Sequence, residues 1–192
     1  MLVLILGLVI FLGIHSVQIV APQWRRAKMA EWGEGKWKGL YSLAAAVGLV
    51  LIVWGFGMAR QTAPILYEPP VWMKHITLLL MAFSFIFLAM FEMPAGKLKP
   101  KIRHPMLVAI KIWAFAHLLA NGDLASLVLF LSFLAWAVWD RISVKRRERA
   151  EGAVVIASGP VINDVLTVVV GLVVYALFVW KLHEWLIGIP PV

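Results

Sequence analysis

Two histidines lie inside apolar segments of this sequence, where an ionisable side chain is costly. His15 stands in "GIHSVQ" and His117 in "KIWAFAHLLANGD". An ionisable residue at membrane depth costs about 2.5 to 3.5 kcal/mol, so it raises a functional hypothesis unless a cheaper explanation exists. His117 is roughly 18 Å along a helix from Pro105, and a short imidazole cannot reach the membrane surface from that depth. These two histidines are therefore the first candidates for chemistry.

Iron suits the two histidines better than zinc does. The chain has no cysteine, which excludes disulfides, thiolate metal sites and a cysteine nucleophile. Two deep histidines on different helices, without a third, fit the axial ligation of one haem iron better than a tetrahedral zinc site. The competing interpretation is that each histidine makes an interhelical hydrogen bond that only fixes packing.

The depth of each histidine along its helix is a partial check on shared ligation. If the first helix runs to Trp24, His15 lies roughly 13 Å from the cytoplasmic end of that helix, whereas His117 lies roughly 18 Å from Pro105. Helix tilt can absorb this difference of about 5 Å in depth. If that helix stops at Pro22, the difference grows and ligation of one iron by both histidines is less favourable.

Other polar residues extend these candidate sites. Trp113 and Asn121 lie four residues before and after His117, so the three side chains share one helix face. Arg103 and His104 stand at the entrance of the same helix, where they can bind a carboxylate or phosphate such as a haem propionate. The alternative for this pair is a cluster of positive charge at the membrane interface.

The remaining polar residues of the apolar segments have simpler explanations. Lys111 has a side chain long enough to reach the headgroups. His75 and His183 are predicted to be surface or packing residues. Asp123 is predicted to cap the fifth apolar segment, and Asn163 or Asp164 the sixth.

These residues must be positioned by membrane-spanning helices. Hydrophobic residues make up 62% of the 192, and the mean hydropathy is +0.90. We predict an all-α integral membrane protein, with spans four and five joined as a short helical hairpin by Asn121 to Asp123. The six predicted spans cover about residues 2–21, 40–59, 72–93, 105–121, 124–140 and 164–187.

The positive charge of the chain is explained by topology. Of the 18 Lys and Arg residues, 14 fall in three segments, 21–39, 94–104 and 141–163, which the positive-inside rule places in the cytoplasm. Both termini are then on the non-cytoplasmic side, and the apolar start of the chain is a retained first helix rather than a signal peptide. The net charge of +8 therefore indicates contact with the lipid bilayer and gives no reason to expect nucleic acid.

The sequence resembles the NnrU family of membrane proteins. The resemblance is carried by "RHPMLVAIKIWAFAHLLANGD", by "GIHS" in the first span and by the closing "LHEWLIGIPP", and it covers nearly the whole chain. It implies one transmembrane domain over residues 1–192 in the bacterial inner membrane. It also implies an association with nitrogen-oxide metabolism and denitrification, with proteins of those pathways or of respiration as partners.

A related protein, the 15-cis-zeta-carotene isomerase, suggests what such a chain does. That resemblance implies haem b held by His15 and His117, and redox-dependent cis-trans isomerisation of a hydrophobic polyene. The isomerase has a cysteine three residues before the second histidine, whereas this chain has Ala114. A thiolate-based ligand switch is therefore excluded here, and whether the chain is an enzyme stays open.

Two other functions compete with a haem protein. One is a non-enzymatic accessory or assembly protein of a respiratory complex, in which the buried polar groups only hold helices together. The other is a membrane methyltransferase that uses S-adenosylmethionine and carries an Arg-His-Pro motif at a similar place. Against the methyltransferase, the segment after the hairpin carries only the isolated acids Glu148 and Glu151.

Overall fold

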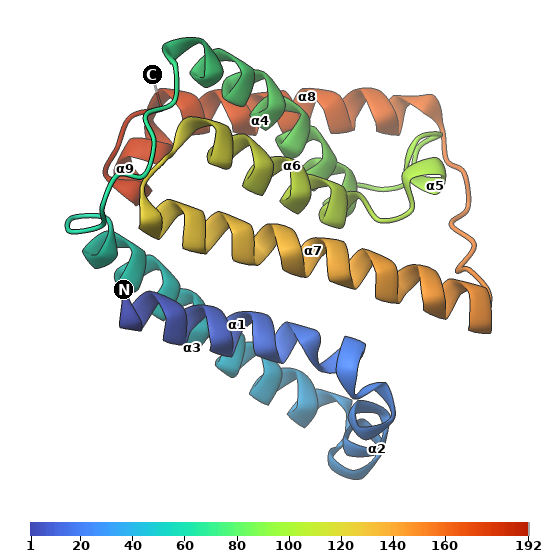
Figure 1. Cartoon of the computed structure of the whole chain (residues 1–192). Helices are drawn as coiled ribbons and strands as arrows, with labels where there is room; N and C mark the ends of the chain where they lie inside the picture. The colour runs from blue at the N-terminus through green and yellow to red at the C-terminus, as the bar shows by residue number, and fades with distance from the viewer. Residues whose placement is uncertain (192) are drawn as a thin grey trace. The chain divides into compact units, whose positions relative to one another are not determined.

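The computed structural model describes residues 1–191, which are helical apart from loops and one isolated bridge between Ile65 and Asp123. The predicted all-α membrane protein is confirmed at this level (Figure 1). In chain order the helices are α1 (Leu2–Val20), α2 (Pro22–Trp32), α3 (Glu34–Ala59), α4 (Val71–Glu92), α5 (Lys99–Ile102), α6 (Pro105–Ala120), α7 (Leu124–Glu151), α8 (Val161–Leu177), the π-helical turn η1 (Phe178–Leu182) and α9 (His183–Ile187).

Within residues 1–191, five helical segments are long and apolar enough to cross a bilayer. They are α1, α3, α4, α7 and the run from α8 to α9 over Val161–Ile187. A span needs about 20 residues, and α6 has 16, about 24 Å of helix. The prediction of exactly six spans is therefore not confirmed, and the side on which the termini lie stays a prediction.

The two ends of α7 are formed in different ways. The Asp123 carboxylate accepts a hydrogen bond from the Ser126 N–H at 2.9 Å, so the predicted cap is confirmed. The helix continues beyond the predicted limit of the fifth span near residue 140 as far as Glu151, because Arg, Lys, Glu and Ala favour helix even after the apolar run stops. Gly152 follows the helix, and its φ of +86° suits glycine.

The predicted cap of the last span is wrong. α8 begins at Val161 after Pro160, and neither Asn163 nor Asp164 caps it. Asn163 instead donates from Nδ2 to the Ala95 carbonyl at 2.9 Å. The Asp164 carboxylate accepts from the backbone N–H groups of Lys97 and Leu98 at 2.7 and 3.2 Å. These two side chains therefore hold the loop that follows α4.

The chain divides into two compact units, each described by itself. The first comprises Met1–Tyr67 and Asp123–Ser143, and the second comprises Glu68–Gly122 and the segment from Val144 onwards. In the first unit α1 packs along α3 (Figure 1). A Cβ added to Gly48 would lie 2.7 Å from the Phe11 nitrogen, so the absence of a side chain permits this close approach.

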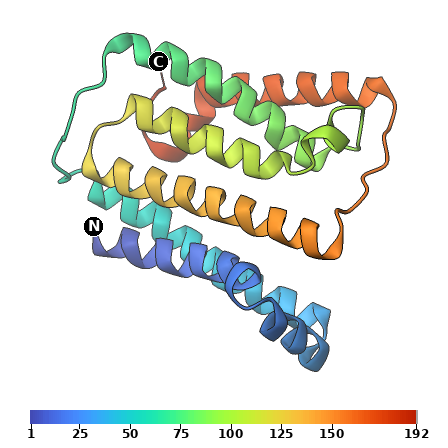
Figure 2. The same cartoon turned by 45° about the vertical axis from the view of Figure 1, so that its right-hand side comes forward.

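In the second unit α4 packs against both α6 and α8 (Figure 2). Two buried hydroxyls join α4 to α6. Thr77 Oγ1 donates to the Ala116 carbonyl at 2.8 Å, and Ser84 Oγ donates to the Ala109 carbonyl at 2.9 Å. Such bonds between helices contribute about 0.6 kcal/mol each on average, and they fix the depth of α6 against α4.

Candidate functional site

His15 lies on α1 in the first unit, and the main chain fixes the orientation of its ring. Its Nδ1 is 2.6 Å from the Phe11 carbonyl oxygen, one turn earlier. Because a carbonyl only accepts, Nδ1 carries the proton and Nε2 carries the lone pair. Metal-ligating histidines commonly donate their other N–H to a backbone carbonyl in this way. Nε2 of His15 is therefore the nitrogen chemically able to bind a metal.

Three helices contribute aromatic rings around His15. The ring centroids of Phe11 on α1, Tyr41 on α3 and Trp136 on α7 lie 4.3, 5.3 and 6.0 Å from that of His15. Sequence reasoning misses Tyr41 and Trp136, because no spacing in the chain reveals which rings tertiary packing will bring to His15.

A groove between α1 and α7 runs past this cluster. It has a volume of about 500 Å³ and mostly apolar walls, with Ser16, Ser132, Trp136 and Trp139 as its polar members. Both hydroxyls are satisfied by their own helices, because Ser16 donates to Leu12 O at 2.7 Å and Ser132 to Val128 O at 2.6 Å. Trp136 Nε1 is buried and has no acceptor within residues 1–191. The groove therefore offers apolar surface and one unsatisfied donor.

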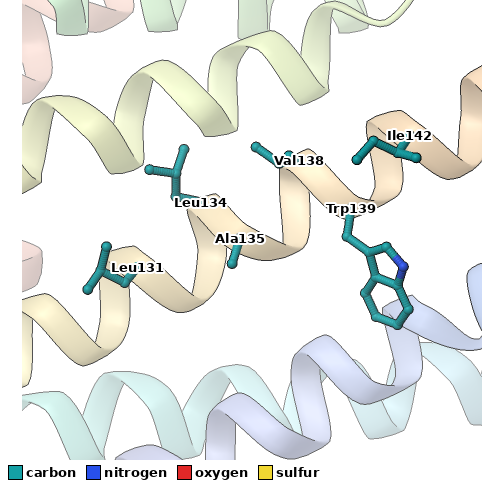
Figure 3. Close-up of a pocket in the computed structure, with 6 residues that line it drawn as sticks. All are labelled: Leu131, Leu134, Ala135, Val138, Trp139 and Ile142. Carbon is teal, nitrogen blue, oxygen red and sulfur yellow. The ribbon is translucent and has the colours of Figure 1, made fainter.

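A second groove, of about 420 Å³, belongs to α7 alone, and the indole nitrogen of Trp139 is the one polar side-chain atom among its lining residues. Figure 3 shows its six labelled residues, all on α7, with Leu134 and Trp139 extending to opposite sides of the helix. A surface of this kind can take a lipid chain, but it offers no group for chemistry.

His117 lies on α6 in the second unit, and its ring is held in the same manner as that of His15. Its Nδ1 is 2.9 Å from the Trp113 carbonyl oxygen, so Nε2 is the ring nitrogen chemically able to bind a metal. The Trp113 ring lies 5.5 Å away, and Asn121 Nδ2 donates to the His117 carbonyl at 2.8 Å. The predicted face of Trp113, His117 and Asn121 is therefore brought together by α6.

The structure adds His183 to this face. Its ring stacks on that of His117, with a centroid distance of 6.4 Å and an angle of 16° between the planes. Its Nδ1 is 2.7 Å from the Ile189 carbonyl oxygen. η1 immediately precedes His183, and π-helical turns are frequent at functional sites. The sequence gives no signal for this turn, so His183 looks like a surface residue there.

Arg103 and His104 have separate environments at the start of α6. His104 Nε2 is 2.8 Å from a Glu148 carboxylate oxygen. The carboxylate that contacts His104 is therefore a side chain of the protein, whereas the sequence suggests that of a ligand. Arg103 is exposed and has a φ of +63°, while the N–H of His104 donates to the Ile102 carbonyl at 2.8 Å. This three-residue turn is rare and strained for a residue with a side chain.

α1 ends at Val20, which changes the depth comparison for His15. The ring lies five residues, about 7.5 Å, from that end, so the alternative in which the first helix runs to Trp24 is wrong. The depth argument for pairing His15 with His117 is thereby lost. Within residues 1–191, no three His, Asp or Glu side chains gather as a metal site, so a centre held by protein ligands alone is not found in that range.

Comparison with known proteins identifies the chain at the level of a family. The family model described as NnrU protein matches residues 3–191, nearly the whole chain, as the sequence resemblance predicts. The comparisons with curated proteins and with solved structures gave no match.

Proposed function

We propose that this chain, which belongs to the NnrU family, is a haem protein of the membrane. The chain is a multi-pass membrane protein that binds haem b through histidine nitrogens, with His15 and His117 as the candidate ligands. One observation carries the proposal. In each of these residues Nδ1 faces the carbonyl four residues earlier, so Nε2 is the ring nitrogen whose lone pair suits a metal.

The surroundings of His15 are compatible with a haem. A haem needs apolar walls, an axial ligand and donors for its propionates. The first unit supplies apolar surface in the groove along α1 and α7, aromatic rings beside His15 and the unsatisfied donor of Trp136. His15 Nε2 would hold the iron, Phe11 and Tyr41 would flank the ligand ring, and Trp136 Nε1 would donate a hydrogen bond to an anionic or carbonyl group.

Haem b, when bound, would supply a redox-active iron that can bind small molecules. This chemistry supports either of two activities: cis-trans isomerisation of a hydrophobic polyene, or a role in nitrogen-oxide metabolism with respiratory or denitrification proteins. Ala114 is fully buried, and the chain has no cysteine, so the isomerase activity would have to proceed without thiolate exchange.

A visible spectrum of the purified protein tests haem binding. The full chain is purified in detergent from haem-replete cells, and a reduced-minus-oxidised spectrum is recorded. We expect a Soret band that is lost or shifted in His15→Ala and in His117→Ala. His75→Ala is the matched control, because His75 is exposed near the start of α4 and should leave the band unchanged.

Two results would overturn the proposal: a colourless wild-type protein, or an unchanged band in both ligand variants. A colourless protein that co-purifies with an oxidoreductase would instead favour the accessory or assembly function.

A membrane methyltransferase is a second candidate, and one contact favours it. The bond between His104 and Glu148 brings the Arg-His-Pro segment to an acidic residue of the α7 extension, which the sequence alone leaves isolated. Calorimetry with S-adenosylmethionine tests this function. Binding that is lost in Glu148→Gln would support it, and absence of binding by the folded wild-type protein would reject it.

A further inference from the structure

α2 is a short polar helix joined directly to two membrane-spanning helices. Only Ala21 separates it from α1, and only Gly33, with a φ of +81°, separates it from α3. None of its residues is buried. Because α1 and α3 both enter the bilayer, α2 must stay near the membrane surface. The sequence offers no apolar run that would have revealed this helix.

Three tryptophans join α2 to the start of α3. Trp37 on α3 is only 5% exposed, and its ring centroid lies 5.7 Å from that of Trp24 and 6.3 Å from that of Trp32. Trp24 itself is 49% exposed. Tryptophan rings favour the headgroup level of a bilayer, so this cluster indicates the depth at which α2 lies.

Basic side chains surround the tryptophans. Lys28 Nζ lies 5.1 Å from the Trp32 ring centroid, and Lys36 Nζ lies 6.0 Å from it. Arg25 is three residues before Lys28 and therefore shares its helix face. We call Arg25 and Lys28 of α2, together with Lys36 in the first turn of α3, the basic face of α2.

Acidic side chains do not cancel this charge. Residues 21–39 contain five basic and two acidic residues, a formal net charge of +3. Lys28 pairs with Glu31 at 2.6 Å, and this hydrogen bond lowers the pKa of the exposed Glu31 carboxyl. Exposed pairs of this kind are weak, so Lys28 can exchange Glu31 for another anion.

We propose that the basic face of α2 binds the phosphate of anionic phospholipids, with Trp24 and Trp32 at headgroup level. The charge, the exposed tryptophan and the forced position at the membrane surface all favour a lipid over a soluble anion. This inference is independent of haem binding, because every residue in it lies outside the two histidine environments.

A spin label on α2 tests the proposal locally. The chain has no cysteine, so Ala30→Cys gives a unique labelling site on an exposed position of α2. The full protein is placed in nanodiscs of phosphatidylcholine with increasing fractions of phosphatidylglycerol. We expect the label to lie at headgroup depth and to lose mobility as phosphatidylglycerol increases, with an effect that weakens at high salt.

Charge variants supply the comparison. Changing Arg25, Lys28 and Lys36 to Gln should abolish the response over the range of phosphatidylglycerol that immobilises the label in the parent protein, because each side chain removed lowers the affinity for an anionic surface by about fivefold. The matched control changes the exposed Lys97, Lys101 and Lys145 to Gln, which removes the same charge from the second unit. The control should leave the α2 label unchanged, and circular dichroism should show that both triple variants are folded.

Three outcomes would overturn the proposal. They are a label that does not respond to phosphatidylglycerol, an equal shift in the control variant, and a response that soluble glycerol phosphate abolishes at the same ionic strength. The last outcome would indicate a site for free anions.

Discussion

The imidazole of His183 lies nearly parallel to that of His117, with 6.4 Å between the ring centroids and 16° between the ring planes. Each Nδ1 faces a main-chain carbonyl, of Ile189 for His183 and of Trp113 for His117, so the main chain holds both ring orientations. The contact joins the C-terminal segment to the candidate ligand on α6.

Removing the His183 ring should loosen the end of the chain. His183→Ala deletes the stacking on His117 and the hydrogen bond to Ile189, and one hydrogen bond contributes about 1 kcal/mol. We expect faster amide exchange over residues 183–189, measured by mass spectrometry in detergent. His75→Ala should leave this region unchanged, and equal exchange in both variants would contradict a stabilising contact.

The close packing of α1 on α3 predicts strong sensitivity at Gly48. An added methyl group would meet the backbone of Phe11 at 2.7 Å, and overpacking typically costs about 1–3 kcal/mol. Gly48→Ala should therefore lower the stability of the protein, measured by thermal unfolding in detergent.

Gly57 provides the control for this prediction in the same helix. A Cβ there meets nothing within 4 Å, so Gly57→Ala should be neutral or stabilising by up to about 1 kcal/mol. Equal destabilisation at both glycines would contradict a cost that arises from the close approach of α1 at Gly48.

Replacing Asp164 should lower the free energy of unfolding by more than replacing an exposed acidic residue. Its carboxylate accepts the backbone N–H groups of Lys97 and Leu98, and hydrogen bonds to charged groups contribute about 1.5–3 kcal/mol. Asp164→Ala should lower the free energy of unfolding by about that amount. Glu184→Ala removes only an exposed pair with Lys181 and should cost less than about 1 kcal/mol. Similar losses would argue against a role for Asp164 in holding the loop.

The positive-inside rule predicts which positions are protected from reagents outside the cell. Single cysteines in place of Gly35 and Lys145 should resist a membrane-impermeant maleimide in intact cells and react after lysis. Labelling of either position in intact cells would contradict the predicted orientation, in which these positions face the cytoplasm. A cysteine near each terminus would then report whether both ends share one side, as six spans require, or lie on opposite sides, as five spans require.

Hydropathy and helical spacing predict part of this molecule. The long apolar helices, the cap at Asp123 and the shared face of Trp113, His117 and Asn121 follow from local sequence, because each depends on residues a few positions apart. Prediction from local sequence fails where contacts between segments far apart in the chain determine the structure. Asn163 and Asp164 look like caps but bind the loop at 95–98, since α8 already begins at Val161.

The same limit applies to both histidine environments. Tyr41 and Trp136 approach His15 from other helices, and no local pattern marks them. α2 escapes prediction because it has no apolar run, and its tryptophans pack on Trp37, which lies beyond its end.

η1 divides the last membrane-spanning segment into two parts whose side chains are rotated relative to each other around the helix axis. Within this turn the His183 N–H donates to the Phe178 carbonyl, five residues earlier, instead of four. Each residue turns a helix by about 100°, so the extra residue rotates everything after it relative to α8. Deleting one residue from Phe178–Leu182 would restore a single phase and carry His183 around the helix axis, while the contacts of α8 with α4 would keep their register. The direction in which the C-terminal histidine points is thus set by one residue of chain length.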